Sequence, residues 1–198
     1  MDQPLKWLPD AGGLPVPAGF IVFRSTPEPD IRAAYEELKI REKTHFVAVR
    51  GPTHAVLNVI GPDALIQTLH RLWSESPDAP VTVQQMIHSM WCGKAEWHGN
   101  ELTITANEGM LMLDPDTYVK GHFVLAPKQR KMIRHVDGTA RIVERQGPRE
   151  PMRGELLAKI SELAARVKSD MGWAIDDLDK VWLLSFGREL ATKGTEGT

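Results

Sequence analysis

The densest chemical signal in the sequence is a run of cationic residues in its third quarter. Four of the eight residues that follow Pro127 are basic and a histidine closes the run: Lys128, Arg130, Lys131, Arg134 and His135. Arginine then recurs at about every fourth position, at Arg141 and Arg145. Guanidinium groups match phosphates and carboxylates in a bidentate manner. The run therefore predicts a strip, at about 120–153, that binds nucleic acid or an acidic protein surface.

The charge distribution along the chain singles out the same segment. Residues 118–168 carry 12 Lys and Arg against 5 Asp and Glu, whereas residues 1–117 carry 9 against 15. The whole chain is nearly neutral, with 24 basic and 26 acidic residues. Such segregation is typical of an anion-binding face. The other interpretation is a solvated ridge balanced by Glu144, Glu150 and Glu155, and it stays open whether residues 127–135 form a short helix or a loop.

A second candidate centre is the single cysteine, Cys92, which lies near His88 and His98. If residues 82–92 form a helix, His88 and Cys92 are i, i+4 neighbours on one face. Such a group suits a transition metal or an activated thiol nucleophile, so the alternative function is a small enzyme or metal-binding protein. Structural zinc needs four ligands and the sequence offers no fourth. We therefore predict that Cys92 packs as a small apolar residue, with no metal, cofactor or catalytic residue.

Six tryptophans form the third chemical feature. Trp73 and Trp91 lie in apolar patterns and are predicted core residues. Trp97 precedes a turn at residues 98–100, where an exposed ring beside basic residues would suit base stacking or a protein contact. A tryptophan-rich surface would also suit a structural subunit of an oligomer, which is a further alternative. The sequence does not fix the oligomeric state.

Several functional classes lack their motifs. The sequence has no phosphate-binding loop, no dinucleotide fingerprint after a strand, no Gly-x-Ser-x-Gly elbow and no His-Glu-x-x-His pair. One cysteine cannot form an internal disulfide. We find no secretory signal at the start, and the longest apolar runs are far shorter than the roughly 20 residues of a membrane span. A cytoplasmic location without a membrane partner is therefore expected.

The elements that must position these residues begin with an extended arm, residues 1–19, rich in proline and glycine. The pattern then predicts a strand at 20–23, a helix after Thr26-Pro27, strands at 45–49 and 55–60, and a helix from Gly61. This order of strand, helix, strand, strand and helix is compatible with a ferredoxin-like layer.

The second half is predicted to combine a meander with helices. A helix from Thr82 with Gln85 as a capping box comes first, followed by strands at 102–105, 110–113, 122–125 and 139–143. After the break at 146–151, an amphipathic helix carries Leu156, Ile160 and Leu163. Asp176 and Asp177 are expected to open another helix, since acidic residues favour helix N-termini.

Together these patterns predict an α+β fold, with a small, mostly antiparallel sheet, packed helices and a C-terminal helical hairpin. The expected organisation is an arm at 1–19, a body at 20–145, the hairpin at 152–191 packed on the body, and a flexible tail at 192–198. The function that this reasoning favours is a non-enzymatic cytoplasmic binding or regulatory protein.

Overall fold

The computed structural model describes residues 4–110, 116–119, 122–124, 130–136, 139–145 and 152–186. The chain folds into two compact units, Met1–Ala11 with Pro17–Met86 (unit 1) and Gly12–Val16 with Ile87–Thr198 (unit 2). It therefore passes from one unit to the other three times. Each unit contains an antiparallel sheet and helix, so the predicted α+β class is confirmed.

Unit 1 is a five-stranded sheet with two helices. Its elements are β1 Lys6–Trp7, β2 Gly19–Val22, α1 Glu28–Glu42, β3 Phe46–Arg50, β4 Ala55–Ile60, α2 Pro62–Glu75 and β5 Val81–Gln85. The strand order is β1-β2-β5-β3-β4, and all neighbours are antiparallel. The strands β2 and β3 are thus parallel with β5 between them, a split βαβ unit. The predicted order of strand, helix, strand, strand and helix along the chain is confirmed, whereas the order of the strands in the sheet is not that of a ferredoxin-like layer.

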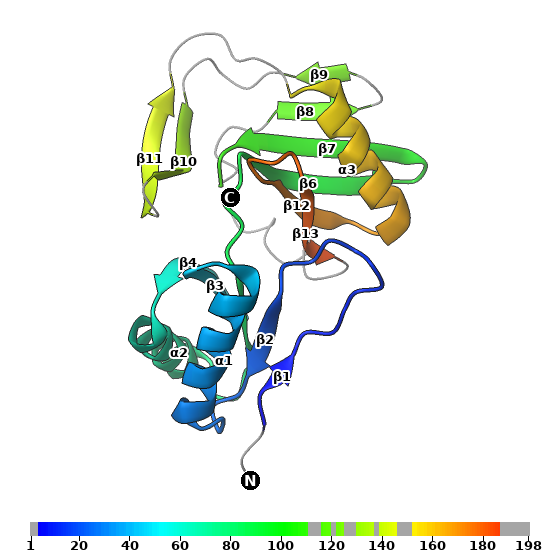
Figure 1. Cartoon of the computed structure of the whole chain (residues 1–198). Helices are drawn as coiled ribbons and strands as arrows, with labels where there is room; N and C mark the ends of the chain where they lie inside the picture. Colours follow the sequence, from blue (N-terminus) through cyan, green and yellow to red (C-terminus); the bar gives the residue numbers. More distant parts are fainter. Residues whose placement is uncertain are drawn as a thin grey trace. The chain divides into compact units, whose positions relative to one another are not determined.

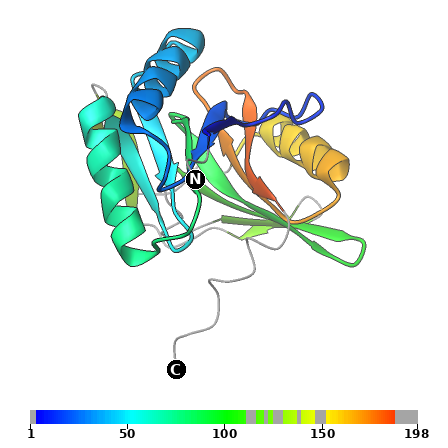
Figure 2. The ribbon, with the colours of Figure 1, turned by 90° about the horizontal axis from the view of Figure 1, so that it is seen from below.

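Both helices of unit 1 cover the same face of the sheet. The buried residues of α1 recur with the helical period, at Ile31, Ala34, Tyr35 and Leu38. The apolar stripe of α2 consists of Leu65, Ile66, Leu69, Leu72 and Trp73. These stripes share one core with alternate strand residues, Phe20 and Val22 among them. Figure 2 shows α1 and α2 side by side along the strands.

The helix predicted from Thr82 is wrong, because this segment is β5. Val81 and Val83 are fully buried while Thr82 between them is half-buried, which is the alternation of a strand. β-branched residues favour strands, and here that preference prevails over the apparent capping box of Thr82 and Gln85.

Unit 2 is built on a six-stranded antiparallel sheet. Its strands are β6 Trp91–His98, β7 Glu101–Glu108, β8 Asp116–Val119, β9 His122–Val124, β12 Met171–Ile175 and β13 Val181–Phe186, in the order β13-β12-β6-β7-β8-β9. Helix α3, Gly154–Val167, lies across this sheet (Figure 1). Strands β10 Arg130–Val136 and β11 Thr139–Arg145 form a separate antiparallel pair. None of the helices within the described ranges is long and apolar enough to cross a membrane.

The predicted C-terminal helical hairpin is wrong in its second half. Helix α3 forms as expected, but residues 171–186 form the hairpin of β12 and β13. Val181 and Leu183 are buried in strand alternation, whereas Leu178 is 84% exposed and Phe186 is 54% exposed. The helical spacing of Leu178, Val181, Trp182 and Phe186 predicts that a helix would bury all four, but Leu178 and Phe186 are exposed. The predicted tail at 192–198 lies outside the described residues.

The core of unit 2 depends on a close approach between strands. Trp173 on β12 is fully buried and packs with Ile160 and Leu163 of α3. Its cross-strand partner on β6 is Gly93. A Cβ atom at residue 93 would lie 2.6 Å from Cζ2 of Trp173 and would also overlap the carbonyl oxygen of Thr105. Glycine is therefore the residue that lets the indole lie over β6.

We predict that Gly93→Ala lowers the free energy of unfolding by about 1–3 kcal/mol, because the added methyl group overpacks a rigid core. The matched control is Gly154→Ala at the start of α3, where an added Cβ atom meets nothing within 4 Å. That control should be neutral or stabilise by up to about 1 kcal/mol. Urea denaturation of both variants measures the difference, and a Gly93→Ala variant as stable as the wild type would contradict the packing described.

Candidate functional site

The structure does not assemble the predicted centre of Cys92, His88 and His98. Cys92 lies on strand β6 and not on a helix, so His98 at the end of the same strand is about 20 Å away. His88 precedes the strand, and burial lowers the pKa of its imidazole. Throughout the described ranges, no three His, Cys, Asp or Glu side chains are grouped to hold a metal ion.

Cys92 itself is a packed core residue. It is 6% exposed and contacts Ile87 and Ala174 in a small apolar cluster. Burial raises the pKa of the thiol to about 12, because the thiolate would be poorly solvated there. The thiol is therefore protonated near neutral pH and is a poor nucleophile or metal ligand. Cys92 therefore packs as a small apolar residue, which is the interpretation that the sequence favoured.

The predicted basic strip is neither a short helix nor a loop where it is described. Arg130, Lys131, Arg134 and His135 lie on β10, and Arg141 and Arg145 lie on β11. Arg134 is the cross-strand partner of Arg141, and Arg130 is the partner of Arg145. Lys128 lies outside the described residues. The contact of these residues with a partner stays a prediction.

Trp97 packs where a surface ring was expected. It lies on β6, is half-buried, and contacts the core of unit 2. Its backbone N–H donates a hydrogen bond of 2.8 Å to the carboxylate of Asp170. Trp73 is buried, and Trp91 is partly buried against the same core as Trp97. All three indoles thus help to build the two cores.

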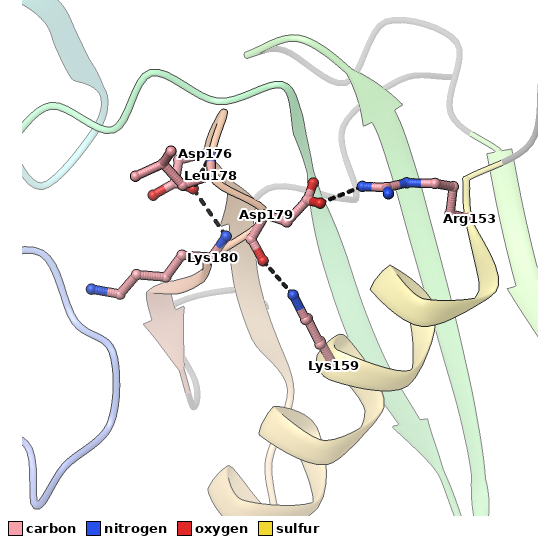
Figure 3. Close-up of polar contacts among 6 residues, drawn as sticks. All are labelled: Arg153, Lys159, Asp176, Leu178, Asp179 and Lys180. Carbon is pink, nitrogen blue, oxygen red and sulfur yellow. Dashed lines mark hydrogen bonds and ion pairs between the residues drawn. The ribbon is translucent and has the colours of Figure 1, made fainter.

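The acidic segment that was expected to open a helix forms the turn between β12 and β13. The Oδ1 atom of Asp176 accepts hydrogen bonds from the backbone N–H groups of Leu178 and Lys180, both at 2.9 Å (Figure 3). Its Oδ2 atom accepts one from Nε1 of Trp182 at 2.8 Å. Asp179 adopts the left-handed conformation with φ 59°. The carboxylate of Asp176 therefore has a structural role in this turn.

The same turn is tied to α3 by two basic side chains. Arg153, at the start of the helix, forms an ion pair with the carboxylate of Asp179, and Nζ of Lys159 donates to the Asp179 carbonyl oxygen at 2.9 Å (Figure 3). The neighbouring carboxylate raises the pKa of Arg153. Arg153, the last residue of the segment 120–153 in which the basic strip was predicted, is thus a structural contact at the start of α3.

A polar site that sequence reasoning missed lies on the sheet of unit 1, on the face opposite both helices. Side chains alternate between the faces, so Ala48 and Arg50 of β3 share this face with Thr82 and Gln84 of β5. Nε of Arg50 donates a hydrogen bond of 2.9 Å to Oε1 of Gln84. Gln84 is only 7% exposed, so a buried amide orients the guanidinium group. We call these residues the Arg50 face.

The Arg50 face suits an anionic ligand. A guanidinium group is planar and charged, a geometry that suits phosphate or carboxylate oxygens, and the hydrogen bond at Nε fixes its plane. Thr82, the cross-strand partner of Arg50, adds a hydroxyl group on the same face. The only sequence signal was an arginine that ends an apolar strand, Val47 to Val49, because Gln84 is 34 residues away along the chain.

Unit 2 also presents polar residues on the sheet face opposite α3. One row crosses five strands and consists of Thr117, Thr105, Lys94, Gly172 and Ser185. Hydroxyl groups beside an ammonium group are compatible with an anion as well. Unlike the guanidinium of Arg50, however, the Lys94 ammonium makes no hydrogen bond or ion pair with another described residue. The Arg50 face is therefore the better organised of the two.

Comparisons with known proteins identify the fold. No protein-family model matches the sequence, and no curated protein matches it. Among solved structures, D-alanine–D-alanine ligase from Bacillus anthracis complexed with ATP is similar, with a TM-score of 0.53 and 12% identity over 88% of this chain and 51% of that one. The D-alanine–D-alanine ligase from Coxiella burnetii is similar with a TM-score of 0.53 and 12% identity, over 89% of this chain and 43% of that one. D-alanyl-alanine synthetase A from Vibrio cholerae is similar with a TM-score of 0.51 and 12% identity, over 90% of this chain and 52% of that one.

This likeness corrects the functional prediction. The chain has the fold found in these ligases and spans about half of their length. The prediction of a non-enzymatic regulatory protein is therefore wrong, whereas contact of the basic strip with nucleic acid or an acidic protein is not tested by this likeness. The sequence analysis missed the fold because at 12% identity the likeness lies in the arrangement of elements and in no local motif.

We expect Cys92 to react slowly with iodoacetamide in the native protein at neutral pH. Its folded pKa of about 12 lies above the ordinary value of 9.0. Burial of the neutral thiol therefore contributes stability that is complete below pH 9 and is lost as the pH rises towards 12. Denaturation curves across this range should show the loss in the wild type and a smaller one in Cys92→Ala. Fast alkylation at pH 7 without unfolding would contradict the burial.

Replacement of Asp176 by alanine should lower the free energy of unfolding by about 1.5–3 kcal/mol, because its charged carboxylate accepts three hydrogen bonds. The control is Asp177→Ala, which removes an exposed charge from the same turn and should change stability by about 0.5 kcal/mol or less. Equal thermal midpoints for the two variants would show that the turn does not depend on Asp176.

Proposed function

We propose that this chain is the nucleotide-binding part of an ATP-dependent ligase. The observation that carries the proposal is the fold likeness, over 88% of the chain, to a ligase whose structure contains ATP. Because the chain spans about half of that ligase, binding of the nucleotide is proposed for this part, and the substrates joined are left to the complete enzyme. Fold alone does not give function, so the proposal must also name a site.

The site proposed for the nucleotide phosphates is the Arg50 face. Its guanidinium is oriented by the buried amide of Gln84, and the cross-strand partner of Arg50 is Thr82, which carries a hydroxyl group. The helices α1 and α2 pack on the other face of the sheet. These donors fit a phosphate, since charge-assisted hydrogen bonds to phosphate oxygens are among the strongest in proteins.

A protein-held metal is not part of this site. ATP is commonly used with Mg²⁺, which prefers carboxylate and phosphate oxygens. The residues placed on the Arg50 face are an arginine, an amide, a hydroxyl and an alanine, and none of them is a carboxylate. Binding at this face therefore depends on Arg50, whose guanidinium attracts the anion directly, and on Gln84, which orients the guanidinium.

When bound, ATP would supply the phosphoryl group that activates a carboxylate for ligation. The part of Arg50 in that chemistry is to hold phosphate oxygens and to offset their negative charge. Gln84 is a positioning residue, because it keeps the guanidinium in one orientation through the 2.9 Å hydrogen bond. A fixed guanidinium needs no reorganisation when the ligand arrives, which favours binding.

A cytoplasmic location is proposed for the protein. The single cysteine is reduced and buried, which suits a reducing compartment. Nucleotide-dependent ligation also needs the ATP pool of that compartment.

The proposal is tested by isothermal titration of the whole chain with ATP. We expect Arg50→Gln to raise the Kd for ATP roughly 10–100-fold, because this is the change in affinity that corresponds to the loss of a hydrogen bond to a charged group. The matched control is Arg32→Gln on α1, in the helical layer, where the arginine forms an exposed ion pair with Asp63. That control should bind ATP as the wild type does. Absence of ATP binding by the wild type, or equal affinity of Arg50→Gln, would refute the proposal.

A further inference from the structure

The sheet face that carries Arg50 and Gln84 can be followed across all five strands of unit 1. Cross-strand partners lie on the same face, and so do residues two apart on one strand. One row of partners consists of Ala55, Arg50, Thr82, Ile21 and Lys6. The next row places Ala48 and Gly19 on either side of Gln84. These two rows contain two cations, one amide and one hydroxyl group, and neither row contains a carboxylate or an imidazole.

The amide of Gln84 is fixed in place by its neighbours. Gln84 is 7% exposed, and its Oε1 atom accepts the hydrogen bond of 2.9 Å from Nε of Arg50. On the other side, a Cβ atom at Gly19 would lie 3.0 Å from Cγ of Gln84 and would overlap the carbonyl oxygen of Val83. Glycine at position 19 thus leaves the room in which the Gln84 side chain packs.

The hydrogen-bonding groups of this face are mainly donors. Because Oε1 of Gln84 accepts from Arg50, the capacity that the amide still offers lies chiefly in the two N–H groups of Nε2. Guanidinium and ammonium groups donate and do not accept. Within the two rows, Thr82 is the one residue whose side chain both donates and accepts. A ligand therefore meets many donors and few acceptors.

Such a face distinguishes anions by whether they carry a proton. A fully ionised oxyanion has only acceptor oxygens, which match donors. A phosphate monoester takes up a proton below its second pKa of about 6, and the resulting O–H group needs an acceptor. Where none is available, the unpaired O–H group lowers the affinity.

We propose that the Arg50 face selects oxyanions that carry no proton. The inference rests on the nucleotide site proposed above and names the part of the nucleotide that Arg50 binds. The terminal phosphate of ATP takes up a proton near pH 6, whereas a phosphate inside the chain carries none near neutral pH, so the inner phosphate is the group at Arg50. Gln84 is the residue that determines this selectivity, because a carboxylate in its place would supply an acceptor.

Methyl sulfate and methyl phosphate test the selectivity. At about pH 5 both are monoanions of nearly equal shape, but methyl phosphate carries one O–H group. We expect methyl sulfate to have a Kd roughly tenfold lower, measured on the whole chain from the NMR shift of the Arg50 Nε–H group. At about pH 8 methyl phosphate is a dianion without a proton, and the order should reverse. If methyl phosphate binds as tightly as methyl sulfate at the lower pH, the proposal is wrong.

The change of pH leaves the charge of this face unaltered. The charged residues that the five strands place on it are Lys6 and Arg50, and lysine and arginine are ordinarily protonated at both pH values. His54, which precedes β4, forms an ion pair with Glu75 of α2. Because the two probes are compared with each other at one pH, titration of such a histidine affects both measurements alike.

The variant Q84E tests the role of Gln84. Since both probes have the same charge at the lower pH, the added carboxylate repels them alike, and the ratio of their Kd values should fall close to one. The matched control is Q67E, which introduces the same charge at an exposed position of α2 and should keep the wild-type ratio. The variant T82V removes the one hydroxyl acceptor and should keep or enlarge the preference. A folded Q84E variant with the wild-type ratio would contradict the role of Gln84, and the wild-type comparison decides the selectivity even if Q84E does not fold.

Titration with ATP separates this proposal from the nucleotide proposal. The ratio of the Kd values of R50Q and the wild type measures what Arg50 contributes, and it should be the same at both pH values if Arg50 binds an inner phosphate. A ratio that falls at the lower pH would assign Arg50 to the terminal phosphate; it would overturn this inference and leave the nucleotide site intact. Selective binding of methyl sulfate without any binding of ATP would refute the nucleotide proposal alone.

Discussion

The packing of Trp173 over Gly93 is the constraint on which unit 2 depends. Strand β12 joins β13 to the rest of the sheet, since β13 pairs with no other strand among the described residues. It can lie beside β6 only because residue 93 has no Cβ atom, which would overlap the indole at 2.6 Å. Once Trp173 is buried there, α3, which precedes β12 in the chain, covers the same face with Ile160 and Leu163. One absent methyl group thus permits the sheet, its helix and the shared core.

The first half of the fold could be predicted from sequence because its signals are local. The helices α1 and α2 show apolar residues at the helical period, and the strands between them are short apolar runs flanked by turn residues. The prediction of strands β5, β12 and β13 failed because helix signals and strand signals conflict within these segments. Thr82 and Asp176 imitate helix N-termini, yet one lies within a strand and the other uses its carboxylate to close a turn. Whether such a segment becomes a helix or a strand depends on its burial against residues distant in the sequence. The periodicity of a short window does not contain that information.

The candidate sites were harder to predict because they form across strands. Arg50 and Gln84 meet through the pairing of β3 with β5, over a separation of 34 residues. The arginines of β10 and β11 recur at intervals of about four, which resembles one face of a helix, but the structure makes Arg134 and Arg141 partners across a hairpin. For Cys92 the reverse happened: a helix would have brought His88 beside it, and the strand carries His98 away. The type of element therefore decides which residues can form a site.

The likeness to ligases at 12% identity also indicates where function must be sought. A core tolerates extensive exchange of apolar residues when volume and pattern are kept, so the fold can persist while nearly all side chains change. Gln84 is buried and bonded to Arg50, although burial of an amide costs desolvation that an apolar residue would avoid. The hydrogen bond to Arg50 offsets that cost, and it also holds the guanidinium in one orientation, which is what the proposed binding of a phosphate requires.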